Sequence, residues 1–237
     1  MENITTVQQP AVPVVAVPTS FIADVFKWMF AALGISAVVA WYFGNDPAYT
    51  SLLINETGMT TLGYVTIFAP LGFVLLMSFG FSKLSSTALI ILFMVYSVIM
   101  GMSLSFIFNI YTAGSIYQTF GIAAGMFGAM AVVGYTTKTD LTKFGSIMIM
   151  GVIGLIVASV INMFIGSDTM DYIVSFFGVL IFTGLTAYDM QRLKRIGSGV
   201  EYGTEATSKL ALMGALSLYL DFINLFLYLL RFFGNRK

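Results

Sequence analysis

Long apolar runs separated by short polar segments occupy the chain from about residue 24 to its end. A helix rises about 1.5 Å per residue, so crossing a hydrocarbon core of about 30 Å takes about 20 apolar residues. Seven stretches are long enough, and the connections between them are short. The pattern therefore predicts an all-α membrane protein, a single bundle of seven transmembrane helices. The expected helices cover residues 24–43, 60–81, 86–110, 115–137, 144–166, 171–193 and 209–233.

The first twenty residues differ from this pattern, because they contain three prolines and no basic residue. A secretory signal peptide carries positive charge ahead of its apolar run, and proline interrupts both helix and strand. We expect residues 1–20 to be a disordered tail and residues 21–237 to form the bundle.

Composition supports lipid as the main solvent, since 58% of the residues are hydrophobic and only 9% are charged. An average soluble domain carries about 25% charged residues. The formal net charge is zero, which gives no reason to expect a nucleic-acid partner. The chain has no cysteine and no histidine, so thiol chemistry, histidine-dependent triads and histidine zinc sites are excluded. We expect no catalytic residues, no enzyme activity and no tightly bound cofactor.

The basic residues indicate the orientation of the bundle. With seven spans, eight of the eleven basic residues fall on one side of the membrane, which is also the side of the N-terminus. The positive-inside rule assigns this side to the cytoplasm. The remaining three basic residues lie at the C-terminus. They are outside the cell if the last segment crosses the membrane fully, and in the cytoplasm if that segment is re-entrant. Its length favours a full crossing. The eight are Lys27, Lys83, Lys138, Lys143, Arg192, Lys194, Arg195 and Lys209.

Two aspartates lie inside the expected helices, whereas the other acidic residues lie in the tail, in loops or close to helix ends. Asp189 falls in the last turns of the sixth helix and Asp221 near the middle of the seventh. An ionisable side chain in a spanning helix costs at least about 2.5–3.5 kcal/mol and usually marks an ion or proton pathway. Both aspartates are therefore candidate site residues.

The seventh helix carries one polar face. Gly214, Ser217, Asp221, Asn224 and Tyr228 follow spacings of three and four residues, which place them on one side of a helix. Such a face must point into the bundle, so we expect the seventh helix at its centre. Ser217 and Asn224 either line an ion pathway or join helices by hydrogen bonds.

If Asp189 and Asp221 meet, they cannot both ionise cheaply, and they would titrate as a pair sharing one proton. Carboxylate oxygens also suit a hard cation such as Ca²⁺, so protons and Ca²⁺ would compete for them. Lys83 is expected at the same membrane side as Asp189. It could pair with that aspartate and hold a gate shut, or it could simply extend to the interface.

Three segments resemble the transmembrane Bax inhibitor motif family, its bacterial branch above all. They are AAGMFGAMAVVGYTTKTDL (123–141), GVLIFTGLTAYDMQRLK (178–194) and ALSLYLDFINLFLYLLRFFG (215–234). The resemblance implies six helices around a central seventh, and a pH-sensitive Ca²⁺ leak channel. It implies that Asp189 and Asp221 form a proton-sharing pair that contacts Ca²⁺ transiently. It also implies a latch at the position of Lys83, where the family has arginine; lysine keeps the charge but lacks the bidentate fork.

A pH-gated Ca²⁺ leak in a bacterial inner membrane is therefore the leading hypothesis, with an organellar membrane as the alternative location. A second hypothesis, based on some bacterial relatives, is a membrane-embedded modulator of a quality-control protease, with the tail as its adaptor. A third is an intramembrane aspartyl protease. It is disfavoured because the chain lacks a GxGD motif around Asp221.

Overall fold

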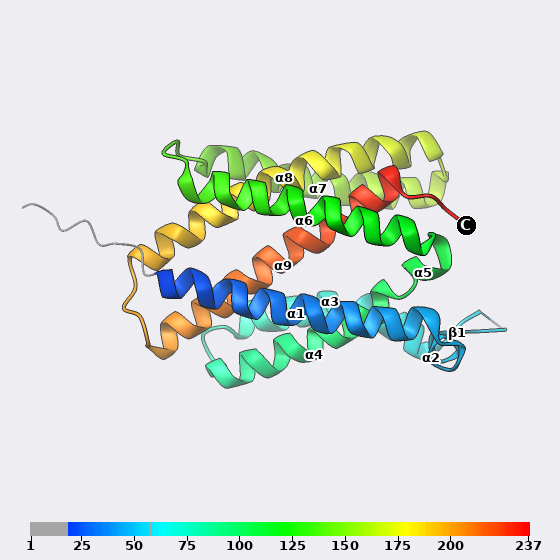
Figure 1. The fold of residues 1–237 in the computed structure, drawn as a ribbon, viewed down its shortest axis with the longest axis horizontal. Coiled ribbons are helices and arrows are strands. Elements are labelled where there is room, and N and C mark those ends of the chain that lie inside the picture. Colours follow the sequence, from blue (N-terminus) through cyan, green and yellow to red (C-terminus); the bar gives the residue numbers. More distant parts are fainter. Residues whose placement is uncertain (1–18, 57) are drawn as a thin grey trace, which may run out of the picture.

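The computed structural model describes residues 19–56 and 58–237 and is helical over most of that range (Figure 1). Seven helices within this described range are long and apolar enough to cross a membrane, which confirms the predicted fold class. The short α5 continues α4 as part of one span. The helices are α1 (Thr19–Asn45), α2 (Pro47–Leu53), α3 (Thr61–Gly80), α4 (Ser86–Leu104), α5 (Ile107–Ile110), α6 (Ala113–Thr136), α7 (Thr142–Ile165), α8 (Asp168–Ser198) and α9 (Glu205–Phe233).

Several helices are longer than their apolar runs, because polar caps define where they begin. The Ser167 hydroxyl accepts a hydrogen bond from the backbone N–H of Met170, and α8 starts before the expected residue 171. Thr204 caps α9 in the same way, ahead of residue 209. α1 already begins at Thr19, so the expected tail is shorter than residues 1–20. Its remainder, 1–18, lies outside the described residues.

The connection between α1 and α3 holds structure that the hydrophobic pattern did not predict. Asp46 caps α2 by accepting from the backbone N–H of Ala48. Two short antiparallel strands follow, β1 (Ile54–Asn55) and β2 (Gly58–Met59). Gly58 has a φ of 116°, a conformation that glycine adopts without steric cost.

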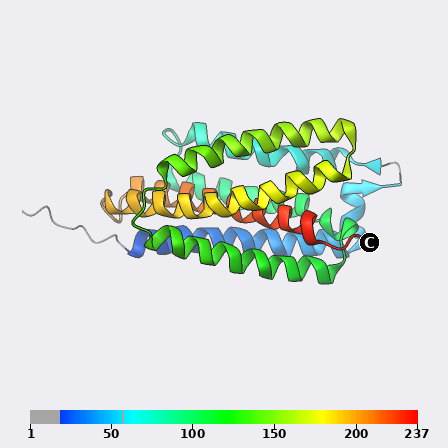
Figure 2. The same cartoon turned by 90° about the horizontal axis from the view of Figure 1, so that it is seen from above.

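The helices form two groups, with α9 crossing between them. α1, α3 and α4 pack together on one side, α6, α7 and α8 on the other, and α9 contacts members of both groups. It runs through the middle of the molecule in both views (Figures 1 and 2). Within the apolar part of α9, 67% of the residues are buried, against 11% for α7. The predicted central position of the last helix is therefore confirmed.

α9 crosses the whole bundle, and the residues after it are held at the far end. The backbone N–H of Lys237 donates to the carbonyl of Ile110, and that of Thr112 donates to the carbonyl of Asn235. Both contacts lie at the α5–α6 junction. The opposite end carries the α3–α4, α6–α7 and α8–α9 connections (Figure 1), and we call it the basic end. The re-entrant alternative for the last segment is therefore not what the structure shows.

Candidate functional site

The two predicted aspartates lie on the most extensive helix pair of the bundle, α8 and α9. Asp189 of α8 is 9% exposed and Asp221 of α9 is 5% exposed. Their carboxyl groups are close enough for the charge of one to act on the other. The structure therefore brings together two side chains that are 32 positions apart in the sequence (221 − 189).

Ser217 explains how the two aspartates meet. Its side chain lies beside the Asp189 carboxyl group, and both residues line the same cavity. Asp221 lies one helical turn beyond Ser217 on the same face of α9. Asp189 is thus level with Ser217, and Asp221 is one turn deeper. Because α8 continues to Ser198, Asp189 also lies further from the basic end than the predicted helix boundary implied.

One oxygen of this pair lacks a partner. Within the described part of the chain, Asp221 Oδ2 is buried and accepts no hydrogen bond. Burying a polar group without a partner costs about 1–3 kcal/mol, and more when the group is charged. This oxygen is therefore the one best placed to take a proton or a cation.

A cavity leads from the basic end to Asp189. Its volume is about 190 Å³, enough for several water molecules. It lies between the last turns of α8 and the first turns of α9, and it does not reach Asp221. Water or an ion from the basic end can thus approach the first aspartate, while the second lies behind it. The lining residues are Asp189, Arg192, Leu193, Ile196, Leu210, Met213, Gly214 and Ser217.

Arg192 is a residue that the sequence analysis did not single out. It follows Asp189 by three positions, which places it on the same face of α8. It lines the same cavity, and its charge acts on Asp189. The signal in the sequence is the i,i+3 spacing of an acid and a base near the end of a helix, in addition to the contribution of Arg192 to the positive-inside pattern.

Lys83 lies in the exposed turn between α3 and α4, at the basic end. The start of α4 approaches α9, since the backbone N–H of Ser86 donates to Glu205 Oε1 over 3.2 Å. Among the residues that the structure describes, Lys83 Nζ makes neither a hydrogen bond nor an ion pair. A latch from Lys83 to Asp189 is not formed here and stays a prediction.

The polar face of α9 points mainly toward α8. Ser217 faces Asp189, and a Cβ built on Gly178 of α8 would lie 2.4 Å from Tyr228 Cγ. Asn224 instead donates its amide to the carbonyl of Leu220 in its own helix, over 2.8 Å. Of the two predicted pathway residues, Ser217 therefore lines the cavity, and Asn224 has its amide donor satisfied within α9.

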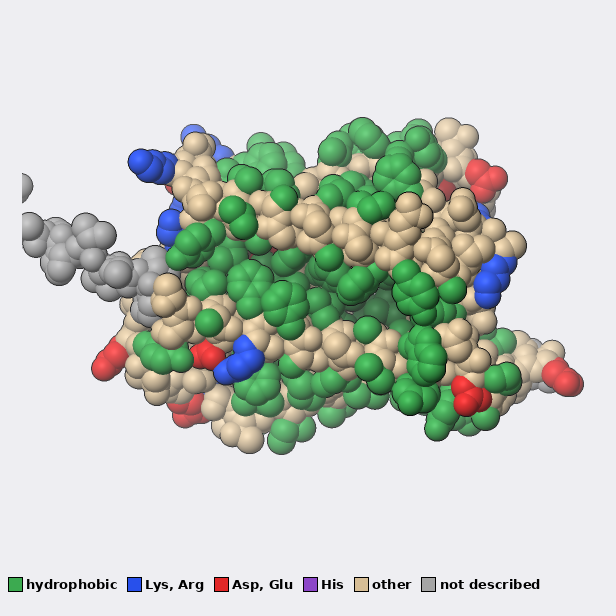
Figure 3. Space-filling view, viewed as in Figure 1, with side chains coloured by type: hydrophobic (Ala, Val, Ile, Leu, Met, Phe, Trp, Pro, Cys, Tyr) green, Lys and Arg blue, Asp and Glu red, His purple; other side chains and the backbone are tan. Residues whose placement is uncertain are grey.

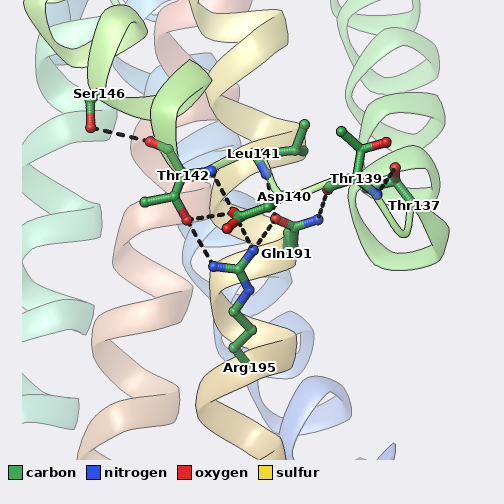
Figure 4. A network of polar contacts seen from close by, with 8 residues as sticks. All are labelled: Thr137, Thr139, Asp140, Leu141, Thr142, Ser146, Gln191 and Arg195. Carbon is green, nitrogen blue, oxygen red and sulfur yellow. Dashed lines mark hydrogen bonds and ion pairs between the residues drawn. The ribbon is translucent and has the colours of Figure 1, made fainter.

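A polar network fixes the end of α8 against the α6–α7 connection (Figure 4). Gln191, two positions after Asp189, accepts from the backbone N–H of Leu141 over 2.9 Å and donates to the carbonyl of Thr139 over 2.7 Å. Arg195 lies one turn further and pairs with Asp140 at 2.6 Å. The network holds the segment of α8 that carries Asp189 in place.

Asp140, in the α6–α7 connection, is the one acidic group of this network. The hydroxyl of Thr142 donates to its carboxylate over 2.6 Å, and the guanidinium of Arg195 donates to the same oxygen. These contacts, that of Thr142 first, hold the pKa of Asp140 well below its usual range. Asp140 is therefore ionised wherever the bundle is folded at ordinary pH.

The acidic groups that the structure describes do not form a closed metal site. Over residues 19–56 and 58–237, no three His, Cys, Asp or Glu side chains gather in metal-binding geometry. Ca²⁺ takes six to eight oxygen ligands in a tight site. Transient contact of Ca²⁺ with Asp189 and Asp221 stays a prediction.

Comparison with known proteins places the chain in a defined group. Residues 18–237 match the family model described as inhibitor of apoptosis-promoting Bax1. Inner membrane protein YbhL of Escherichia coli K12 is 45% identical over 219 residues, which cover 92% of each chain. A protein of Borreliella burgdorferi is 44% identical over 223 residues, covering 94% of this chain and 95% of its own length. A protein of Rickettsia prowazekii is 42% identical over 218 residues.

Proposed function

Because this chain belongs to the Bax inhibitor family, we propose that it is a pH-sensitive Ca²⁺ leak channel in which Asp189 and Asp221 share a proton. We further propose that it lies in a bacterial inner membrane, as the name of YbhL says of that relative, with its N-terminus in the cytoplasm. In this proposal the protein conducts ions and catalyses no reaction.

The observation that carries the proposal is the unpartnered Oδ2 of Asp221 beside Asp189. Two carboxylates so deep in a bundle repel each other strongly because the surrounding dielectric is low. One shared proton removes that repulsion, and a divalent cation between them would remove it too. Proton and Ca²⁺ are therefore alternative ways of neutralising the same pair.

Loss of the shared proton would change the forces between α8 and α9. The two negative charges repel, and Asp189 is drawn toward cations at the basic end, where Arg192 already lies. Since α9 contacts both helix groups, a shift of this helix reaches the whole bundle. The response should be graded with pH, because the shift in population is limited by the difference in interaction energy.

The test is Ca²⁺ flux into proteoliposomes containing a fluorescent Ca²⁺ indicator, measured across a pH series. Asp189→Asn and Asp221→Asn should each lose the pH dependence of the wild type. Asp168→Asn is the matched control, since that aspartate is exposed in the first turn of α8, away from the basic end and from the pair. Absence of flux above empty liposomes at every pH would refute the channel. Unaltered pH dependence in both variants would make the aspartates structural.

The modulator hypothesis depends on the N-terminal tail, and residues 1–18 lie outside the described part of the structure. It stays a prediction with its own test, deletion of the tail. A leak should survive this deletion, whereas an adaptor should lose its effect on the protease.

A further inference from the structure

α1 and α6 both pack on α9 but hardly touch each other. Between them the surface is hollowed (Figure 3), and a cavity of about 490 Å³ opens there to the outside of the bundle. We call it the α1–α6 crevice. Its walls include Phe26 and Phe30 of α1 and Gly128 and Val132 of α6, and its floor includes Met190 of α8 and Phe222 of α9.

The crevice is apolar from rim to floor. Phe30 and Val132 at the rim are 61% and 62% exposed, whereas Phe222 at the floor is 3% exposed. Small residues usually let helices approach closely in lipid. Gly128 does not serve that purpose, because no heavy atom lies within 4 Å of a Cβ built on it. The residues that the structure describes therefore leave this space unfilled, at a depth that hydrocarbon occupies in a bilayer.

A second cavity, of about 280 Å³, lies further along the same two helices. Trp41 of α1 and Tyr117 of α6 line it, and Ile223 and Phe226 of α9 form its floor. Tryptophan and tyrosine favour the membrane–water interface. Two apolar cavities thus lie one after the other along α9, between the basic end and the opposite interface.

Positive charge lies at the basic end of the crevice. Tyr135 of α6 lines it there, and Lys194 Nζ donates to the Tyr135 carbonyl over 2.7 Å and lies over its ring. An ammonium group has three donors, so two of them are left for a ligand. Lys138, just beyond α6, is exposed and forms no ion pair with any described residue. The positive charge of Lys27, on the α1 side, is neutralised by an ion pair with Asp24 at 2.5 Å.

We infer that the α1–α6 crevice binds a phospholipid with an anionic headgroup, with one acyl chain against Phe222 and the phosphate at Lys194 and Lys138. Hydrocarbon fills the space between the two helices and gains contacts that a void would lack. The lysines on the α6 side supply the charge that favours an anionic headgroup. This inference concerns lipid recognition and is independent of the proposed leak, since it needs neither aspartate.

The first experiment is photolabelling of the full-length wild-type protein with phosphatidylglycerol that carries a diazirine on its acyl chain. Peptide mass spectrometry should find label on Met190 and Phe222, which only a chain inside the crevice can reach. Phosphatidylcholine with the same chain should label these two residues several-fold less. Label confined to residues on the outer faces of the helices would overturn the site, and equal labelling by the two lipids would overturn the anionic assignment.

The second experiment fills the crevice. Gly128→Trp should reduce the phosphatidylglycerol retained in native mass spectra several-fold. Gly125→Trp is the matched control, since Gly125 is on the same helix with open space around it and does not line the crevice. Equal retention in wild type and both variants would indicate nonspecific lipid and contradict the site. A detergent-stable dimer that carries no lipid would show that a second copy covers this face, which would also overturn it.

Discussion

Gly178 of α8 faces the ring of Tyr228 of α9 so closely that a Cβ on Gly178 would lie 2.4 Å from Tyr228 Cγ. Nearer the basic end, a Cβ on Gly214 of α9 would lie 2.4 Å from Leu193 Cδ2 of α8. Asp189 and Asp221 lie between these two contacts along the helix pair. The two glycines thus set the close approach of α8 and α9 that places the carboxyl groups together.

Gly178→Ala should destabilise the bundle. The added methyl group meets a ring that cannot move without displacing α9, and overpacking of this kind costs about 1–3 kcal/mol. Thermal unfolding in detergent, followed by tryptophan fluorescence, measures the effect. Gly154→Ala is the control, because nothing lies within 4 Å of a Cβ there, and alanine favours helix over glycine. Equal stability of the two variants would contradict the close contact.

Asp221→Asn should raise the stability of the folded protein at alkaline pH. The wild type then holds two neighbouring buried charges, and the substitution removes one of them. We expect a gain of about 1–3 kcal/mol. The gain should shrink at acidic pH, where both carboxyl groups of the wild type are protonated. Thermal unfolding across a pH series checks this. A variant less stable than wild type at alkaline pH would show that Asp221 has a stabilising partner.

The pKa of Asp140 should rise toward its usual value when its donors are removed. The hydroxyl of Thr142 is the largest cause of the lowered pKa, and the hydrogen bond and charge of Arg195 lower it too, so Thr142→Val and Arg195→Gln should each raise it. Carboxyl NMR titration in micelles measures both. Because the folded-state pKa is lowered, Asp140 stabilises the fold above its unfolded pKa of about 3.9, and this contribution is lost as pH falls toward the folded value. A pKa that stays unchanged in either variant would contradict this assignment.

A cysteine placed at Glu201 and one placed at Lys237 should be accessible from opposite sides of the membrane. Glu201 lies in the α8–α9 connection at the basic end, and Lys237 is held at the α5–α6 end. The chain has no native cysteine, so in each single-cysteine variant the introduced thiol is the only one in the sequence that the reagent can label. Labelling with a membrane-impermeant maleimide in right-side-out and inverted vesicles shows on which side of the membrane each cysteine lies. Labelling of both from the same side would contradict a full crossing by α9.

The number of spans and the central place of α9 could be predicted before any contact was known. Both follow from the order of residues along a single helix. The length of an apolar run decides whether it crosses a membrane, and the spacing of Ser217, Asp221 and Tyr228 decides that one face of α9 must be covered. The exact helix ends were less predictable, since caps such as Ser167 and Thr204 lie outside the apolar runs.

Contacts between helices depended on the tertiary structure. Three such relations join segments far apart in the chain: Ser217 lies beside Asp189, Gln191 holds the α6–α7 connection, and α1 and α6 leave a crevice. A run of apolar residues determines that a helix is buried in lipid or protein, but not which neighbour covers it. That choice depends on side-chain shape across several helices at once, at positions such as Gly178 and Gly134, where a close approach to α9 or α8 requires glycine.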